Sequence, residues 1–197
     1  MNSATDVTEL ADACVAYVKR SLQLELDYSQ DTLPLLDHYL HQAANQARTN
    51  RTPEAVLAPL IPTAGAYFGQ LVVHQFPGCR FHAPGDDYGH YRVEFSPFFL
   101  HFNPLGIAHE VLLGEDAPGW HAHFAVLDEA KPVVEQSLST SLALREQDYY
   151  SFSVRYETLE QVVAVLSALE EQRPGPPRTF SADVYEGAVG NRTGNEG

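Results

Sequence analysis

Two histidines spaced by two residues, His121 and His123, are the strongest candidates for chemistry in this sequence. We expect them on an extended segment, where alternate side chains project from the same face. Their imidazoles could then reach one cation, with His101, His109 or Glu110 as further ligands. No HExxH pattern or neighbouring cysteine completes a tetrahedral set, so a polar strand face beside solvent is the simpler interpretation.

A cysteine and a pair of acids offer two other candidate sites. Cys79 with His82 or His74 could form a nucleophile and its base, but no third group to orient the histidine can be identified. Asp86 and Asp87 are adjacent, so their side chains point in opposite directions on an extended chain, and a solvated turn is the simpler interpretation. Because no enzyme motif remains, we favour a non-catalytic protein without a cofactor and leave enzymatic activity open.

The composition favours one acidic domain in a reducing compartment. The 197 residues carry a net charge of −14, with 26 carboxylates against 12 lysines and arginines. This charge makes contact with nucleic acid or anionic lipid unfavourable. Cys14 and Cys79 form no CxxC pair, the N-terminus lacks a signal-peptide pattern, and no apolar run is long enough to span a membrane. We therefore predict a cytoplasmic protein that binds neither membranes nor nucleic acid.

Apolar residues at spacings of three and four dominate the first 75 residues, and they predict helices there. We expect these helices over residues 4–21, 33–48 and 63–75, with a short helical turn at 54–60 and an extended segment at 22–28. In the third helix Gly65 and Gly69 are four residues apart, without a phosphate-binding pattern around them. We expect these two glycines to allow close packing against another element.

Strand patterns are mixed with helices after residue 75. We expect strands over residues 80–82, 90–96, 98–103, 120–127 and 149–156, and helices over 104–113, 131–144 and 158–171. The sequence thus predicts an α+β fold, with N-terminal helices packed on a mainly antiparallel sheet and further helices in the C-terminal half. We expect one domain over residues 1–173, and a disordered tail over 174–197 because that segment is rich in proline and glycine.

The segment LELDYSQDTLPLLDHYL, residues 24–40, resembles the opening of a widespread group of uncharacterised bacterial domains. These domains share an LDYSxxSLxxLDxxL box, a helix with a Tyr-x-Gly-Glu core and a Gly-Gly-x-Trp strand. The matching positions cover about the first half of the chain, with Gln70 in place of the acid and Phe81 in place of the tryptophan: Leu26, Asp27, Tyr28, Ser29, Thr32, Leu33, Leu36, Asp37, Leu40, Tyr67, Gly69, Gln70, Gly78 and Phe81. The group has no assigned activity, so the resemblance implies a bacterial domain and no mechanism.

Three hypotheses for the function follow from the charge and from the lack of an enzyme motif. The first is a non-catalytic protein-binding or regulatory domain, for example of the immunity type, that engages a basic protein partner through an acidic surface. The acidic residues that we expect at such a surface are Glu157, Glu160, Glu170 and Glu171. The second is a metal-dependent hydrolase built around His121 and His123. The third is an accessory domain without a specific charged target, and the oligomeric state is left open by all three.

Overall fold

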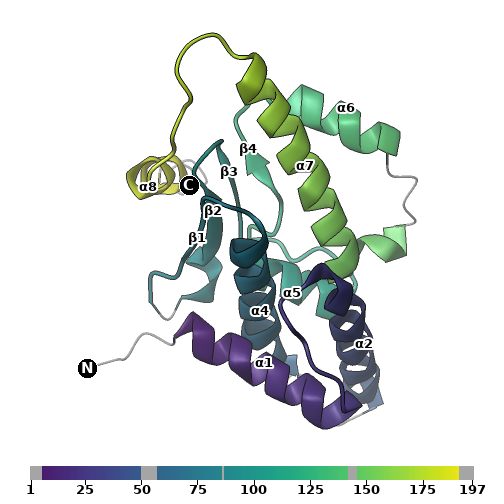
Figure 1. Cartoon of the computed structure of the whole chain (residues 1–197). Coiled ribbons are helices and arrows are strands. Elements are labelled where there is room, and N and C mark those ends of the chain that lie inside the picture. Colours follow the sequence, from purple (N-terminus) through teal and green to yellow (C-terminus); the bar gives the residue numbers. More distant parts are fainter. Residues whose placement is uncertain (1–5, 50–56, 86, 142–145, 191–197) are drawn as a thin grey trace.

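The structure is a computed structural model that describes residues 6–49, 57–85, 87–141 and 146–190 (Figure 1). Helices make up most of these residues, and the strands form one four-stranded sheet. In chain order the elements are α1 (Val7–Leu22), η1 (Gln30–Thr32), α2 (Leu33–Thr49), α4 (Leu60–Gln75), β1 (Cys79–His82), η2 (Tyr88–His90), β2 (Arg92–Phe95), β3 (Leu100–Phe102), α5 (Pro104–Leu113), β4 (Ala125–Val126), α6 (Lys131–Ser141), η3 (Glu146–Tyr149), α7 (Phe152–Gln172) and α8 (Ala182–Gly190).

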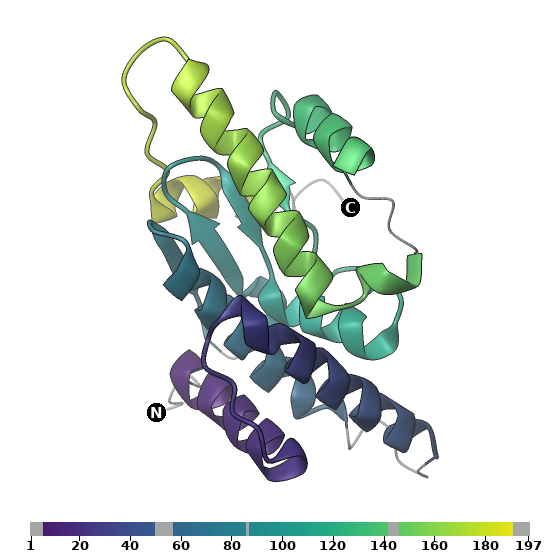
Figure 2. The ribbon, with the colours of Figure 1, turned by 45° about the vertical axis from the view of Figure 1, so that its right-hand side comes forward.

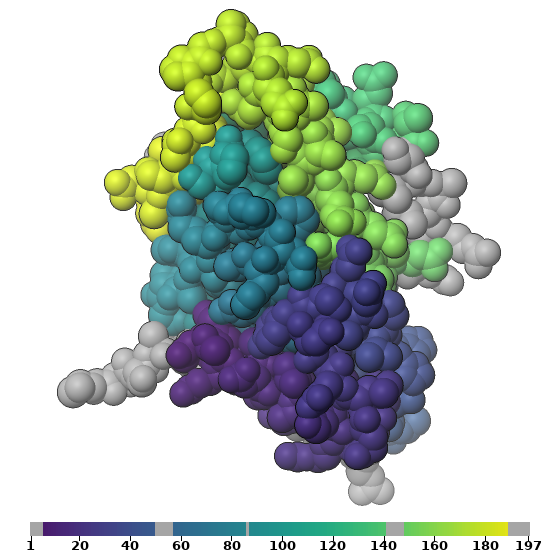
Figure 3. Space-filling view, viewed as in Figure 1, coloured from purple at the N-terminus to yellow at the C-terminus, as the bar shows by residue number. Residues whose placement is uncertain are grey.

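The arrangement of these elements confirms the predicted α+β fold. The sheet is antiparallel throughout, in the order β1-β2-β3-β4. Helix α4 contacts β1, β2 and α5, and α1 packs on α4, whereas α7 contacts α2, α5 and α6. In Figures 1 and 3 the purple N-terminal helices lie at one end of the molecule, with the sheet and α7 above them. No described helix is long and apolar enough to cross a membrane.

Two glycines in α4 bring this helix close to its neighbours, as predicted. A Cβ atom on Gly65 would lie 2.5 Å from the Cα atom of Leu105 in α5, and one on Gly69 would lie 2.2 Å from the ring of Phe81 in β1. Both distances are shorter than real contacts of a Cβ atom. Any side chain at these positions would therefore push α4 away from α5 or from the sheet.

Helix α5 is the element whose limits match the prediction most closely, because its end signals are local. The Asn103 side chain accepts hydrogen bonds from the backbone N–H groups of Leu105 and Gly106, at 2.9 and 3.2 Å, and Pro104 occupies the first turn. Gly114 ends the helix in the left-handed conformation, with φ 74°.

The strand register divides the side chains of the sheet into two faces. The face toward α4, which we call the apolar face, carries Cys79, Phe81, Val93, Phe95, Leu100, Phe102 and Val126. The opposite face, which we call the polar face, carries Arg80, His82, Arg92, Glu94 and His101. Both faces are covered, because α8 packs on the polar face through contacts with three of its residues, Arg80, Arg92 and His101.

Helix α8 lies in the segment that was predicted to be a disordered tail, so that prediction is wrong for residues 182–190. Tyr185 of α8 is fully buried, and its ring stacks on Phe99 at 4.7 Å between centroids. Its hydroxyl accepts a hydrogen bond from Leu100 N at 3.1 Å and donates to the Phe95 carbonyl oxygen at 2.6 Å. One tyrosine thus supplies both apolar contact and hydrogen bonds, although the segment has few apolar residues. Residues 191–197 lie outside the described residues.

Two predicted strands also differ from the structure. The extended segment expected at 22–28 pairs with no strand and links α1 to η1, and only Ala125–Val126 of the segment 120–127 pairs with β3. The segment 149–156 is not extended, because α7 begins inside it at Phe152. The N-terminus of α7 is stabilised by Asp37 of α2, whose carboxylate accepts hydrogen bonds from Phe152 N at 2.7 Å and Ser153 N at 3.0 Å. Part of the expected helical turn at 54–60 lies outside the described residues.

The residues of the LDYS box meet α4 at the turn before α2. Asp27 accepts hydrogen bonds from Ser29 N at 2.9 Å and from the Thr32 hydroxyl at 3.1 Å. The Tyr67 hydroxyl of α4 accepts one from Tyr28 N at 3.0 Å, and the rings of Tyr28 and Tyr67 stack at 4.7 Å. These contacts give the box a structural role, which is to fix the entry of the chain into α2.

Candidate functional site

The two histidines that were singled out for metal binding do not share a strand face. His121 has a positive φ of 52°, and both His121 and His123 are exposed in the segment before β4. Of the further ligands that we expected, His101 packs against the Tyr185 ring and His109 packs against the Trp120 ring. Within the described ranges, no three His, Cys, Asp or Glu side chains are grouped so that they could hold a metal ion.

Glu110, the third expected ligand, is used by a buried ion pair. Its carboxylate pairs with the Arg155 guanidinium of α7, and both side chains are almost fully buried. The Arg155 guanidinium also lies 3.6 Å from the Tyr149 ring centroid and donates to the Tyr149 hydroxyl at 2.6 Å. The second Glu110 oxygen accepts a hydrogen bond from Ala117 N at 3.2 Å. This cluster holds α5, η3 and α7 together and leaves Glu110 no access to a ligand.

Cys79 and His82 are separated by the sheet itself. Cys79 lies on the apolar face and His82 on the polar face. Burial raises the pKa of the Cys79 thiol to about 12, so this thiol is protonated at neutral pH. Asp87 caps η2 by accepting a hydrogen bond from Gly89 N at 3.0 Å, which is the turn role expected for it. Asp86 lies outside the described residues.

Three of the four predicted acidic residues form a row on α7. Glu157, Glu160 and Glu171 are exposed. Glu160 and Glu171 follow Glu157 by 3 and 14 residues, so all three lie on the same side of a helix with 3.6 residues per turn. Partial burial and the neighbouring Glu157 raise the pKa of Glu160. In the described part of the chain, none of these three carboxylates forms an ion pair. We call these residues the α7 acidic row; Figure 2 shows α7 crossing the near side of the molecule.

The fourth acidic residue, Glu170, is on a different side of α7 and is not free. It accepts hydrogen bonds from Arg173 at 3.1 Å and from the Nε atom of Arg178 at 2.9 Å. These two arginines lower the pKa of Glu170, chiefly through the hydrogen bonds from Arg178. Its assignment to an open acidic surface is therefore corrected: this carboxylate already has cationic partners from its own chain.

Internal pairing of this kind involves most of the described lysines and arginines. The cations that contact a carboxylate of the chain are Lys19, Arg80, Arg92, Lys131, Arg155, Arg173 and Arg178. Because 26 carboxylates outnumber 12 lysines and arginines, acids outside these pairs set the sign of the surface potential. In the α7 acidic row, Glu157 and Glu160 are such acids on adjacent turns, and Glu171 lies about three turns further along the same side.

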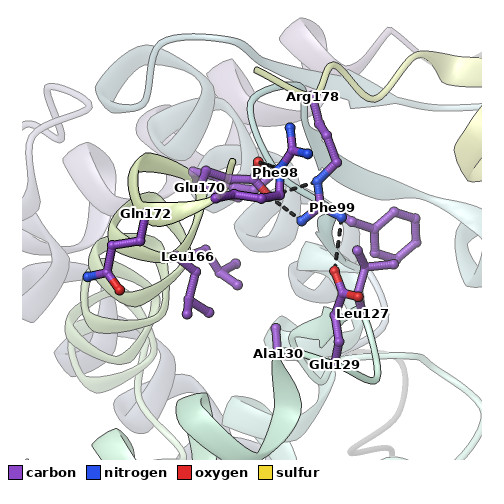
Figure 4. Close-up of a pocket in the computed structure, with 11 residues that line it drawn as sticks. Phe98, Phe99, Leu127, Glu129, Ala130, Leu166, Glu170, Gln172 and Arg178 are labelled. Atoms are coloured by element: carbon purple, nitrogen blue, oxygen red, sulfur yellow. Dashed lines mark hydrogen bonds and ion pairs between the residues drawn. The ribbon is translucent and has the colours of Figure 1, made fainter. Parts of the chain in front are cut away.

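A cavity of about 290 Å³ lies beside Glu170, between the ends of α6 and α7 and the residues before β3 (Figure 4). Its apolar lining is formed by Phe98, Phe99, Leu127, Ala130, Leu166 and Leu169. Arg178 lies at its mouth and donates hydrogen bonds to Glu170 and, at 2.9 Å, to Glu129. Arg178 belongs to residues 173–181, the segment between α7 and α8, which we call the strap. An apolar interior with a few charged groups at the mouth is typical of binding pockets.

A larger and more polar hollow lies between α2, α5 and the start of α7. It is lined by His38, His41, Asn45 and Arg48 of α2 and by Tyr150 and Ser151 across from them. Asp37 also lines it, but its oxygens are used by the N-terminus of α7. His41, Asn45 and Arg48 are exposed, so this hollow is a surface depression and not an enclosed site.

Comparisons with family models, with curated proteins and with solved structures find no match to this chain. Sequence reasoning found the α7 acidic row but missed the cavity, because the cavity is formed by segments between residues 98 and 178 that meet only in the fold. The sequence signal that could have indicated the strap is Arg178 itself, a cation followed by an aromatic residue in a segment that was assigned to disorder.

Proposed function

We propose that this protein is a non-catalytic binding domain that engages a basic protein partner through the α7 acidic row. The observation that supports this proposal is the row of carboxylates at Glu157, Glu160 and Glu171, which form no ion pair in the described part of a chain whose described lysines and arginines mostly pair with other acids. Partial burial and, second to it, repulsion by the neighbouring Glu157 raise the pKa of Glu160. A basic partner would relieve this repulsion, and the net charge of −14 would accelerate its approach.

The proposal predicts that location matters and not only net charge. In the test variant Glu157→Lys, Glu160→Lys and Glu171→Lys are combined. The matched control combines Glu9→Lys, Asp31→Lys and Glu135→Lys, three exposed acids outside the row. Both variants change the net charge by the same amount, so a difference between them reports the position of the binding surface.

The measurement has two steps. Proteins captured from a native lysate by the wild-type chain are identified, and the association rate of a captured protein is then measured by surface plasmon resonance at several salt concentrations. We expect the association rate to fall about tenfold in the α7 variant and its salt dependence to flatten. Equal association rates for the α7 variant and the control variant would contradict the proposal.

A further inference from the structure

The cavity beside Glu170 contains, at its mouth, an arginine of the chain itself. Arg178 donates to Glu170 through its Nε and Nη2 atoms and to Glu129 through Nη1. Three N–H groups of one guanidinium thus serve two carboxylates, Glu170 on α7 and Glu129 in the turn before α6. A planar fork can do this, whereas the single ammonium of a lysine cannot match the same geometry. The two acids therefore form a site with a preference for arginine.

The strap fills the mouth of this cavity but not its interior. Of the strap residues, Arg173 and Arg178 line the cavity, and both are polar at their tips. The apolar walls formed by Phe98, Leu166 and Leu169 therefore face a space that no side chain of the strap occupies. An apolar space of this size next to an arginine site can take one large apolar side chain.

We propose that this cavity is a docking site for a partner segment that carries an arginine followed by a large apolar residue, and that Arg178 holds the arginine position until the partner binds. This inference rests on the proposed function, because it describes the chemistry of the basic partner. The occupant is chosen by charge complementarity: Glu129 and Glu170 provide two carboxylates, and Arg178 shows which group they accept.

Displacing Arg178 requires little structural change. The Arg178 side chain is 34% exposed and that of Glu129 is 67% exposed, so this ion pair contributes little stability. The Glu170 side chain is only 15% exposed, so its pair with Arg178 is the main interaction that a partner must replace. The strap is fixed independently by Phe180, whose N–H donates to the Ser96 carbonyl oxygen at 2.9 Å and whose ring packs against Phe99. The Arg178 side chain can therefore swing away while the strap and α8 stay in place.

The test uses the full chain and four synthetic peptides with blocked ends. The first peptide, GPPRLG, keeps the strap sequence up to the arginine and adds a leucine. GPPALG lacks the arginine, GPPRSG lacks the apolar residue, and GPPKLG replaces arginine by lysine. Binding is followed by ¹H–¹⁵N NMR titration, which detects weak complexes and reports whether the amides of Phe99, Leu127 and Leu169 shift.

Arg178→Ala removes the internal competitor, and Arg20→Ala, an exposed arginine on α1, is the matched control. We expect GPPRLG to bind Arg178→Ala about tenfold more tightly than it binds the wild type or Arg20→Ala, because the competing intramolecular pairs are lost. The other three peptides should bind Arg178→Ala at least about tenfold more weakly than GPPRLG does.

Two further variants in the Arg178→Ala background separate the charge from the cavity. Glu129→Gln removes one carboxylate, and Ala130→Leu fills the space without changing charge; each should weaken GPPRLG binding. Equal affinity of GPPRLG for the wild type and for Arg178→Ala would overturn the proposal, and so would equal binding of GPPALG. Self-association of Arg178→Ala without peptide would also overturn it, by making a second copy the occupant.

These outcomes are independent of those for the α7 acidic row. Loss of partner capture in the α7 variant tests the proposed function, whereas the peptide titration tests only the cavity. If GPPRLG fails to bind while the α7 variant still loses its partner, the proposed function stands and the cavity proposal falls. If GPPRLG binds and the α7 variant keeps its partner, the row is excluded and the cavity site remains.

Discussion

The apolar and polar faces of the sheet are both buried, but they are buried in different ways. On the apolar face, Phe102 packs against Phe68, and Phe95 packs against Phe76, which directly follows α4. On the polar face, Glu94 is fully buried between Arg80 and Arg92, at 2.5 Å from each. The first face is stabilised by contact area alone. The second contains charges that compensate one another, so no single member can be removed alone without loss of stability.

This difference determines how each face responds to change. Apolar packing loses stability in proportion to the atoms removed and the cavity left behind. A buried ionic cluster is different, because removing one member leaves the others buried without a partner, although replacing the whole cluster by apolar residues can be neutral. The comparison therefore predicts graded effects on one face and effects that depend on the combination on the other.

The largest expected effect is on the apolar face. Phe102→Ala should lower the free energy of unfolding by about 4 kcal/mol, because Phe102 is fully buried and contacts Phe68 and Phe124. Urea unfolding followed by circular dichroism measures this loss. Leu113→Ala, at an exposed residue, is the control and should change little. A loss below about 1 kcal/mol for Phe102→Ala would show that this face is loosely packed.

The next largest effect is expected for a single substitution in the ionic cluster of the polar face, compared with replacement of the whole cluster. Glu94→Ala should cost about 3 kcal/mol, because it leaves Arg80 and Arg92 without their shared carboxylate. The triple variant Arg80→Met, Glu94→Leu, Arg92→Met should be more stable than Glu94→Ala alone. The coupling is measured by urea unfolding, as the difference between the stability loss of the triple variant and the summed losses of its three single substitutions. Strictly additive losses would remove the distinction between the two faces.

The third effect concerns the cover of the polar face. Deleting residues 182–197 should lower the free energy of unfolding by about 2 kcal/mol, because the buried Tyr185 and its hydrogen bonds are lost. Tyr185→Ala should reproduce most of this loss, whereas Val184→Ala, at an exposed position of α8, should not. An unchanged melting temperature after the deletion would mean that α8 contributes nothing to stability.

The smallest effect is a dependence on pH. Burial, followed by the charge of Arg92, lowers the pKa of His82 below its usual 6.5, while Glu94 and Glu186 act in the opposite direction and Arg80 in the same one. Between the lowered pKa of folded His82 and the pKa of 6.5 in the unfolded chain, the unfolded chain binds more protons than the folded protein. The contribution of His82 to the free energy of unfolding is therefore fully present above pH 6.5 and is lost as the pH falls. Urea unfolding at pH 7.5 and 5.5 should show a smaller loss for His82→Gln than for the wild type.

The parts of the fold that the sequence predicted well are those with local signals. Helix α5 is flanked by its own capping residues, Asn103 before it and Gly114 after it. The spacing of Gly65 and Gly69 predicted that α4 packs closely against neighbouring elements. Helix α8 was missed because few residues attach it to the sheet, chiefly Tyr185 and Glu186, and the average composition of the segment does not reveal them. The start of α7 was missed even though Ser151 caps it locally; the second group that accepts hydrogen bonds from its first N–H groups, Asp37, is 115 residues distant.

The candidate site shows the same division. Helical spacing predicts that Glu157, Glu160 and Glu171 lie on one side of α7. The same spacing places Glu170 on another side, because it precedes Glu171 by one residue and is therefore rotated by about 100° around the helix axis. What the sequence could not supply is the partner of Glu170, because Arg178 reaches it from a segment whose path depends on the docking of α8. Likewise, the alternating polar residues of β2 predict a polar face of the sheet, but they do not predict that α8 covers this face.

The capping of α7 by Asp37 has a consequence for the order in which the chain can fold during synthesis. Residue 37 leaves the ribosome long before Phe152 and Ser153, whose N–H groups it accepts, and Glu110 likewise precedes its partner Arg155. Until α7 is made, the Glu110 carboxylate, which ends almost fully buried, and the Asp37 carboxylate, which ends partly buried, must remain hydrated, so α2 and α5 cannot close on each other completely. The N-terminal helices can form early, but their final packing waits for the last third of the chain.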